Sequence, residues 1–347
     1  MKRSIFIFCL LSAMLTSCLE REVEVTFGIP KASPRLVLNS VISANAEIRA
    51  HISLTGSGMT SYDEFALRKD ATVRVYINDV PKGIMIRDDD PMDSVSIPGY
   101  YRLPEVLPVA SDKVRLEVDY EGVPSVSAET TIPKLVEISS IDTVRYTIKT
   151  GWYNDRRLRV YANIKDDPTG DNYYIVVMKS IYKGMEYTIW SSYSNGYYFL
   201  YGPDGSTSNF SSFIYYDDPA FSANPGFGAN NSQGFANNIF TDKLFNGKEY
   251  LLKFSFSPYY YYYEEDEREM PAEVDYQVSI ISLSRSYYDF INKFTDFGIT
   301  IGGIHFSRPY LSSYTNVENG FGIVSASSEY RHTIRFSTTD EFFDPYW

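Results

Sequence analysis

Apolar and polar residues alternate along the first part of this chain. The alternation covers residues 36–41, 48–54, 72–77, 114–118 and 126–132. Successive side chains of a strand point to opposite faces, so this period of two predicts strands with one buried face. Turns are predicted at Asn78-Asp79 and Glu121-Gly122, and no helical period competes before Pro133. Short strands at this spacing favour an antiparallel, immunoglobulin-like β-sandwich over residues 35–133.

The remaining residues, 134–347, predict a second antiparallel β-rich domain. Strands are expected over 138–148, 157–164, 173–178, 187–193, 197–201, 249–257 and 274–283. The dipeptide Asn195-Gly196 is a strong hairpin signal between two of them. Residues 202–234 are rich in Gly, Asn, Ser and Pro and predict a long loop, a feature that is usually functional.

One segment, at about 286–297, has the period of an amphipathic helix. Tyr287, Phe290, Ile291 and Phe294 form an apolar stripe at i, i+3, i+4 and i+7. The spacing of Ser286 and Asp289 suggests a capping box, and Gly298 follows as a stop signal. We expect this helix to pack on a sheet; binding a partner helix is the alternative.

The N-terminus has the pattern of a bacterial lipoprotein signal. Lys2 and Arg3 precede an apolar run that is too short to span a bilayer and ends at Leu15-Thr16-Ser17-Cys18. Cleavage after residue 17 would leave Cys18 as an acylated N-terminus, followed by a tether over 18–34. The alternative is a soluble secreted protein with an incidental cysteine. No later stretch is long and apolar enough for a spanning helix, so we expect the lipid to be the membrane attachment.

Composition narrows the possible partners. The formal charge of −12 and a pI near 4.8 argue against nucleic acid as a partner. Cys9 lies within the signal, so the mature chain is expected to have no disulfide and no cysteine-ligated metal. The 31 Tyr residues fit aromatic cross-strand pairs, or alternatively a binding surface rich in tyrosine.

Motifs that carry catalytic chemistry are absent from the sequence. His51, His305 and His332 have no base or ligand neighbour at a diagnostic spacing, and no nucleotide-binding or nucleophile motif occurs. Acidic clusters lie at Asp88 to Asp90 with Asp93, at Asp166-Asp167 with Asp171, and at Asp217-Asp218. Calcium prefers such loops, but Asp is also a routine turn residue. We therefore expect no enzyme, no cofactor and no metal.

Five consecutive tyrosines precede an acidic run at 264–267. They are Tyr259, Tyr260, Tyr261, Tyr262 and Tyr263. Aromatic rings beside carboxylates suit sugar rings or a basic partner, which makes this segment a candidate ligand or partner surface. A solvated hairpin loop is the simpler alternative.

Several segments together resemble a known family. They are the lipoprotein signal with its acidic tether, 35–39, 69–76, 130–133, Asp217-Asp218-Pro219, 240–247 and above all the motif at 313–324, Ser-Tyr-Thr-Asn-Val-Glu-Asn-Gly-Phe-Gly-Ile-Val. Their order and spacing are similar to the Bacteroidota surface lipoproteins known as domain of unknown function 4249. The resemblance covers essentially the whole mature chain.

The resemblance implies an outer-membrane lipoprotein, lipid-anchored and facing the cell surface, that assists a TonB-dependent receptor in nutrient capture. It supplies no catalytic residues. In the motif, Asn319, Gly320 and Gly322 would permit a tight turn with positive φ and close backbone approach. Ser94 and Thr143 lie in triplets similar to the O-glycosylation site of that phylum. The alternative function is an adhesin or structural surface module that binds protein or glycan, and an enzyme acting on polysaccharide is a third, weaker one.

Overall fold

The structure is a computed structural model of the full chain. It describes residues 33–55, 67, 69–88, 99–150, 153–182, 185–189, 200–201, 207–208, 213–216, 218–222, 238–257, 273–294, 299–301, 304–306 and 314–337. Residues 34–347 form one compact unit.

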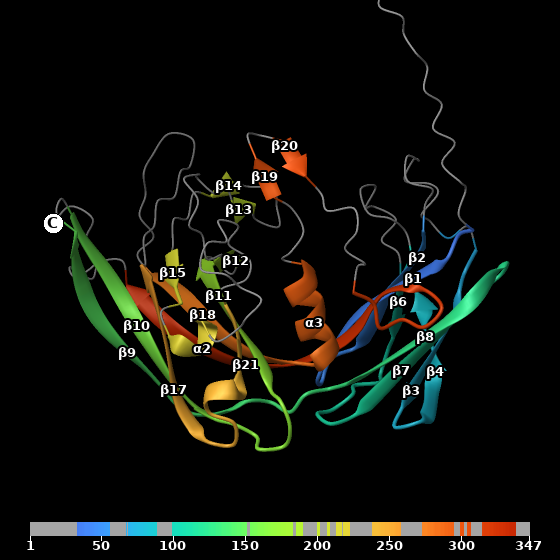
Figure 1. Ribbon diagram of the computed structural model, residues 1–347, viewed down its shortest axis with the longest axis horizontal. Coiled ribbons are helices and arrows are strands. Elements are labelled where there is room, and N and C mark those ends of the chain that lie inside the picture. Colours follow the sequence, from blue (N-terminus) through green and yellow to red (C-terminus); the bar gives the residue numbers. More distant parts are fainter. Residues whose placement is uncertain are drawn as a thin grey trace, which may run out of the picture. The chain divides into compact units, whose positions relative to one another are not determined.

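A nine-stranded sheet runs through most of this unit (Figure 1). Its strands in spatial order are β12 (Met185–Ile189), β11 (Tyr173–Tyr182), β18 (Glu273–Leu283), β21 (Phe321–Ser337), β1 (Leu36–Ser43), β2 (Ile48–Leu54), β6 (Tyr100–Leu103) and β5 (Ile86–Arg87), with β16 (Ile239–Thr241) also paired to β11. The pairings are antiparallel except for that of β1 with β21, which is parallel.

Two four-stranded antiparallel sheets accompany it. Sheet B has the order β4 (Val80–Ile84), β3 (Thr72–Ile77), β7 (Lys113–Tyr120) and β8 (Val123–Thr131). Sheet C has the order β15 (Phe213–Tyr215), β17 (Glu249–Ser257), β10 (Tyr153–Lys165) and β9 (Glu137–Thr150). The remaining elements are two-stranded sheets of β13 (Leu200–Tyr201) with β14 (Thr207–Ser208) and β19 (Ile299–Ile301) with β20 (Ile304–Phe306), and the helices α2 (Pro219–Ser222), η2 (Asp242–Leu244) and α3 (Arg285–Phe294).

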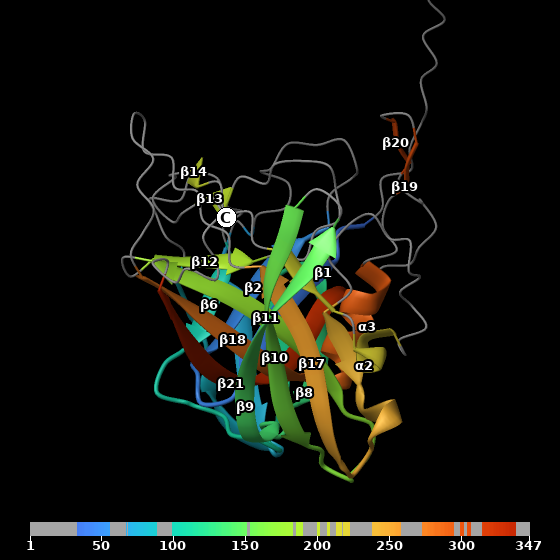
Figure 2. The ribbon, with the colours of Figure 1, turned by 90° about the vertical axis from the view of Figure 1, so that its left-hand side faces the viewer.

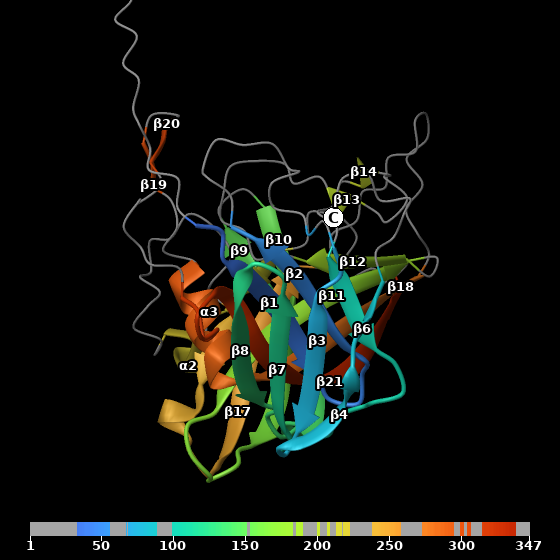
Figure 3. The same ribbon diagram turned by 90° about the vertical axis from the view of Figure 1, so that its right-hand side faces the viewer.

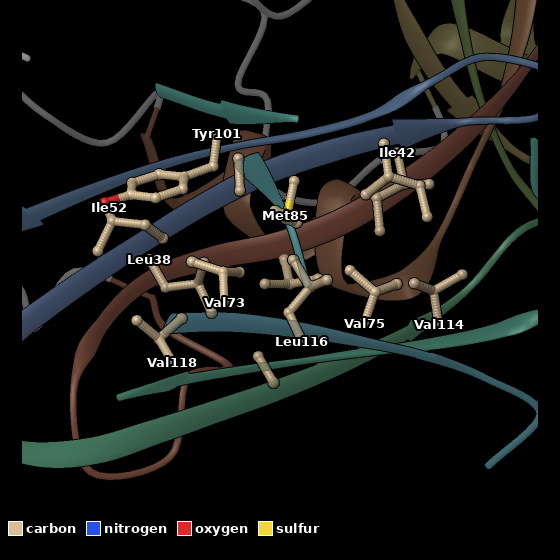
Figure 4. Packing of buried hydrophobic residues seen from close by; sticks show 14 of the residues in the cluster. Leu38, Ile42, Ile52, Val73, Val75, Met85, Tyr101, Val114, Leu116 and Val118 are labelled. Atoms are coloured by element: carbon tan, nitrogen blue, oxygen red, sulfur yellow. The ribbon is translucent and has the colours of Figure 1, made fainter. Parts of the chain in front are cut away.

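The first hydrophobic core lies between sheet B and one end of the nine-stranded sheet (Figure 3). Figure 4 shows Leu38, Ile42 and Ile52 facing Val73, Val75, Val114, Leu116 and Val118 across this space. The alternation of the sequence explains the packing, because every second side chain of β3 and β7 is buried. These strands are the ones that the period of two predicted.

The second core lies between sheet C and the other end of the nine-stranded sheet (Figure 2). Even-numbered residues of β10 and β17 face even-numbered residues of β11 and β18. The buried members are Leu158, Val160, Ala162, Ile164, Leu252, Phe254, Phe256, Tyr174, Val176, Met178, Tyr276, Val278 and Ile280. Phe240 of β16 and Phe245, which follows η2, add aromatic rings to this core.

One strand, β21, serves both cores. Val324 and Ala326 are buried in the first core, whereas Tyr330 and Ile334 pack against the second. All four are even-numbered, so a single face of β21 contributes to both cores. Val317, just before β21, is also buried in the first core. The first sandwich is therefore completed by the C-terminal end of the chain.

The predicted amphipathic helix is α3, and it packs on a sheet as expected. Its residues Tyr287, Tyr288 and Ile291 contact a third apolar cluster that includes Tyr173 and Leu283. The rings of Tyr173 and Tyr288 are stacked, with centroids 4.3 Å apart. Since Tyr173 and Leu283 are odd-numbered, α3 covers the face opposite to the second core.

The predicted capping box of α3 is wrong. The Oγ atom of Ser284 accepts the backbone N–H of Tyr287 at 3.3 Å, which makes Ser284 the N-cap. Ser286 instead donates to the carbonyl oxygen of Val324. Asp289 pairs with Arg285, with 2.9 Å between Oδ2 and Nε. The predicted stop at Gly298 lies outside the described residues.

The prediction of a mainly β fold with antiparallel sheets and an amphipathic helix is confirmed. The turns at Asn78-Asp79 and at Glu121-Gly122 join β3 to β4 and β7 to β8. The stretch 202–234, predicted as a loop, contains β14, β15 and α2. The immunoglobulin-like assignment of residues 35–133 stays a prediction, and the two facing sheets are consistent with it. Among the described helices, none has the length and apolar character needed to cross a membrane.

Candidate functional site

The residues predicted as sites lie in different parts of the chain. Cys18, Ser94 and the tyrosines 259–263 fall outside the described residues. Thr143 is exposed on β9, and Asn319, Gly320 and Gly322 belong to the motif that leads into β21. The structure describes this motif from residue 314 onward.

The backbone of the motif has the predicted turn geometry. Asn319 has a φ of 61° and Gly322 a φ of 103°. A Cβ atom on Gly322 would lie within 3.0 Å of the Leu38 carbonyl oxygen and 2.7 Å from the Leu38 carbonyl carbon. A Cβ on Gly320 would lie 2.6 Å from the Leu36 carbonyl oxygen and from Cγ1 of Val126. Both glycines thus allow close approach to β1 and β8, which a larger residue would prevent.

The side chain of Asn316 fastens the motif to β21. Its Oδ1 atom accepts the N–H of Val324 at 2.9 Å, and its Nδ2 atom donates to the Val324 carbonyl oxygen at 2.7 Å. The same Nδ2 atom donates to the carbonyl oxygen of Glu129 in β8 at 3.3 Å. The Asn316 amide group therefore makes the two backbone hydrogen bonds with Val324 that a neighbouring strand would otherwise make. It also joins β21 to sheet B through Glu129.

A second link joins the motif to β8. The N–H of Glu318 donates to the carbonyl oxygen of Ser127 at 2.8 Å, and the Ser127 hydroxyl donates to the Glu318 carboxylate at 3.2 Å. On β1, the Oδ1 atom of Asn39 accepts the N–H of Ile323 at 3.2 Å. The motif thus holds β1, β8 and β21 together, which is a structural role.

The motif at 240–247 forms a polar cluster around buried Asp242. Its Oδ2 atom accepts the N–H of Asn172 at 2.9 Å, Nδ2 of Asn172 at 3.2 Å and Nδ2 of Asn246 at 3.1 Å. Burial raises the pKa of the Asp242 carboxyl, and the Asn172 hydrogen bonds oppose that shift. The carboxylate acts as an acceptor that shapes the loop between β10 and β11.

Asp166 completes this cluster from the end of β10. It accepts the hydroxyl of Tyr174 at 2.6 Å and the N–H of Gly247 at 2.8 Å. Burial, followed by the hydrogen bond to Asp166, raises the pKa of the Tyr174 phenol far above its usual range. Gly247 has a φ of 68°, so this turn also needs a residue that accepts the left-handed conformation.

The next residue, Asp167, contacts the connection between β8 and β9. Its carboxylate pairs with Lys134, with 2.5 Å between Oδ2 and Nζ, and accepts the N–H and hydroxyl of Thr169. The Lys134 and Thr169 hydrogen bonds lower the pKa of Asp167 to about 2. This pair attaches the connection after β8 to the loop that follows β10.

The remaining acidic clusters give no metal site in the part of the chain that is described. Asp218 is buried and accepts three protein groups: the N–H of Ala220, the hydroxyl of Tyr250 and the N–H of Lys253. Asp88 pairs with Arg102 at 3.0 Å. Within the described residues, no group of three or more His, Cys, Asp or Glu side chains is placed to hold a metal ion.

The outer face of sheet C combines arginines with tyrosine rings. The guanidinium carbon of Arg157 lies 3.3 Å from the ring centroid of Tyr215, and that of Arg159 lies 4.4 Å from the ring centroid of Tyr146. Val144 is half exposed on the neighbouring strand β9. No local pattern predicts this surface, because the three strands that build it meet only in the folded sheet.

Comparison with known proteins identifies the family of this chain. The family described as "Domain of unknown function (DUF4249)" matches residues 22–333. Comparison with curated proteins gives no match. The matched range contains both hydrogen-bonded motifs, β1 and nearly all of β21. The chain therefore belongs to the DUF4249 family.

Proposed function

We propose that this protein is a non-enzymatic lipoprotein of the outer membrane that faces the cell surface and assists a TonB-dependent receptor in nutrient capture. The observation that carries the proposal is the family match over residues 22–333 together with the lipoprotein signal that ends at Cys18. The match begins four residues after that cysteine, so anchor and family region are adjacent.

The anchor has a clear physical basis. Each buried methylene contributes about 0.8 kcal/mol, so two or more acyl chains on Cys18 hold a protein on a membrane durably. The tether over 18–34 then separates the lipid from β1, which begins at Leu36. Such an arrangement leaves the β-rich unit free to contact a neighbouring membrane protein.

The role of an accessory to a receptor is supported by the resemblance to lipoproteins whose genes accompany TonB-dependent receptors. The two described family motifs make their hydrogen bonds within the fold, at Asn316 and at Asp242. We therefore assign partner contact to the surface and not to these motifs. The acidic composition of the chain keeps such a tethered protein soluble.

Affinity purification of the tagged protein from detergent-solubilised membranes tests the proposal. We expect a transporter barrel to be recovered with the full chain. A Cys18→Ser variant, which cannot be acylated at the thiol, is expected to leave the membrane fraction and to lose the barrel. Intact-mass measurement of the wild-type protein should show the acyl chains directly.

Two results would count against the proposal. An unmodified Cys18 thiol in the mature protein would remove the anchor. Recovery of no barrel, combined with binding to extracellular protein or glycan in cells that lack the receptor, would support the adhesin alternative instead.

A further inference from the structure

The strand β21 is the last described strand of the chain, but it lies inside the nine-stranded sheet. Residues 37–43 of β1 lie opposite residues 321–327 on one side of it, and residues 273–283 of β18 lie opposite residues 327–337 on the other. β21 is therefore the contact between the two ends of this sheet. Without it, the facing sides of β1 and β18 are two rows of backbone donors and acceptors that lack partners.

The first core depends on side chains from the C-terminal end of the chain. Val317, Val324 and Ala326 are at most 5% exposed in this core. The segment that carries them also joins the two facing sheets, because the Asn316 amide bonds to β21 and to the Glu129 carbonyl oxygen of β8. The strands between residues 36 and 131 thus have an apolar face that they do not cover by themselves.

The second core depends on the same strand. Tyr330 and Ile334 pack against it, and Ser328, which precedes them, donates to the Pro133 carbonyl oxygen at 2.6 Å. Neither core is therefore complete until β21 has been added. The elements that can form early are local hairpins such as β3 with β4 and β7 with β8, and an isolated hairpin is only marginally stable in water.

Synthesis delivers the two sides of this sheet at very different times. Chains grow at about 5 to 20 residues per second, so about 10 to 40 s separate residue 133 from residue 347. A small domain that folds by itself needs about a second or less. A first sandwich that folded by itself would be complete long before the C-terminus exists, whereas a sandwich that needs β21 must wait for it.

We propose that residues 314–337 are a closing strap: the chain stays open until this segment is available, and the two cores then close around it in one step. The strap acts through nonlocal contacts, such as the hydrogen bond between Ile323 and Asn39, residues that are 284 positions apart. Contacts of this kind form late, because the entropy of closing the long loop must be overcome first. The N-terminal half then stays unfolded while the rest of the chain is made and, if the signal acts as proposed, exported.

Stalled ribosomes test the closing strap with the full mature chain. The chain is joined to the ribosome through a C-terminal linker of one of two lengths. The short linker holds the strap inside the exit tunnel and the long linker releases it, while residues 35–133 are outside in both. We expect a protease to digest residues 35–133 at least a hundredfold faster with the short linker, because digestion follows the population of open chains.

Two glycine variants on the long linker provide a matched comparison. A Cβ on Gly320 would lie 2.6 Å from the Leu36 carbonyl oxygen, so Gly320→Ala should weaken docking of the strap and raise digestion at least a hundredfold. A Cβ on Gly122 would meet nothing within 4 Å, so Gly122→Ala should raise digestion only about fivefold, through its positive φ. The difference assigns the resistance of residues 35–133 to docking of the strap and not to release of the chain from the tunnel.

Refolding of the free chain provides a second measurement, which needs no ribosome. In pulse-labelled hydrogen exchange after dilution from urea, the amides of β7 and of β21 should become protected with a single rate constant. Resistance of residues 35–133 at the short linker, or protection of β7 at least tenfold faster than that of β21, would overturn the proposal, because the first sandwich would then fold by itself.

Neither readout of the closing strap involves acylation or a partner. Failure of the closing strap therefore leaves the proposed function intact. An unmodified Cys18 thiol, in turn, leaves the closing strap intact, because the fold carries this inference and the lipid anchor does not.

Discussion

The substitution Gly322→Ala tests the idea that β21 holds the two cores together. Gly322 has a φ of 103°, a conformation that costs an L residue about 1 kcal/mol or more. The new Cβ would also lie 2.7 Å from the Leu38 carbonyl carbon and 2.8 Å from Oδ1 of Asn39. Since β1 must move to relieve this overlap, we expect a further cost of about 2 to 3 kcal/mol from overpacking and weakened strand pairing.

Gly122→Ala is the matched control for this substitution. Gly122 has a φ of 82° in the turn between β7 and β8, and a Cβ there would meet nothing within 4 Å. It should therefore lose only the conformational contribution, about 1 kcal/mol. The difference between the two variants isolates the close approach of β21 to β1.

Urea denaturation measures the difference. With a slope of about 3 kcal/mol/M, Gly322→Ala should lower the midpoint by about 1 M and Gly122→Ala by about a third as much. Hydrogen exchange adds a second test, because β21 belongs to both cores. Under conditions of partial unfolding, β7 of the first core and β10 of the second should lose protection together.

Two results would refute this reasoning. Equal midpoints for the two glycine variants would show that the close approach at residue 322 costs nothing. Loss of protection in β7 while β10 stays fully protected would show that the cores unfold independently and that β21 does not couple them.

Three further predictions concern the polar groups. Asn316→Ala removes both hydrogen bonds to the β21 backbone and should lower the free energy of unfolding by about 2 kcal/mol in urea titrations; no change would show that water replaces the amide. Asp218→Ala leaves buried donors unpaired and should cost about 3 kcal/mol, measured as a fall in Tm. The depressed pKa of Asp167 contributes stability that is complete above its unfolded pKa near 3.8 and is lost as pH falls towards 2. The loss should be about 1 kcal/mol, because the pair is partly exposed, and smaller in Lys134→Met, in which the Thr169 hydrogen bonds remain.

Local patterns were sufficient for several strands and two turns, but not for residues 202–234, which were predicted as a loop and contain β14, β15 and α2. The period of two predicted β1, β2, β3 and β7, because one face of each strand is buried and the other is wet. The stripe in 286–297 predicted α3, although its N-cap is Ser284 and not Ser286. The cap depends on where the chain leaves β18, and the spacing of residues within the helix does not contain that information.

The sequence by itself determined that the chain is built from strands, where its hairpin turns lie at Asn78-Asp79 and Glu121-Gly122, and that residue 322 is a glycine suited to a turn. Only the tertiary structure decided that β21 lies between β18 and β1, and that β9 is an edge. The physical reason is distance along the chain. The hydrogen bond from the N–H of Ile323 to Oδ1 of Asn39 joins residues that are 284 positions apart. No local pattern of apolar and polar residues specifies which distant strand will complete a sheet.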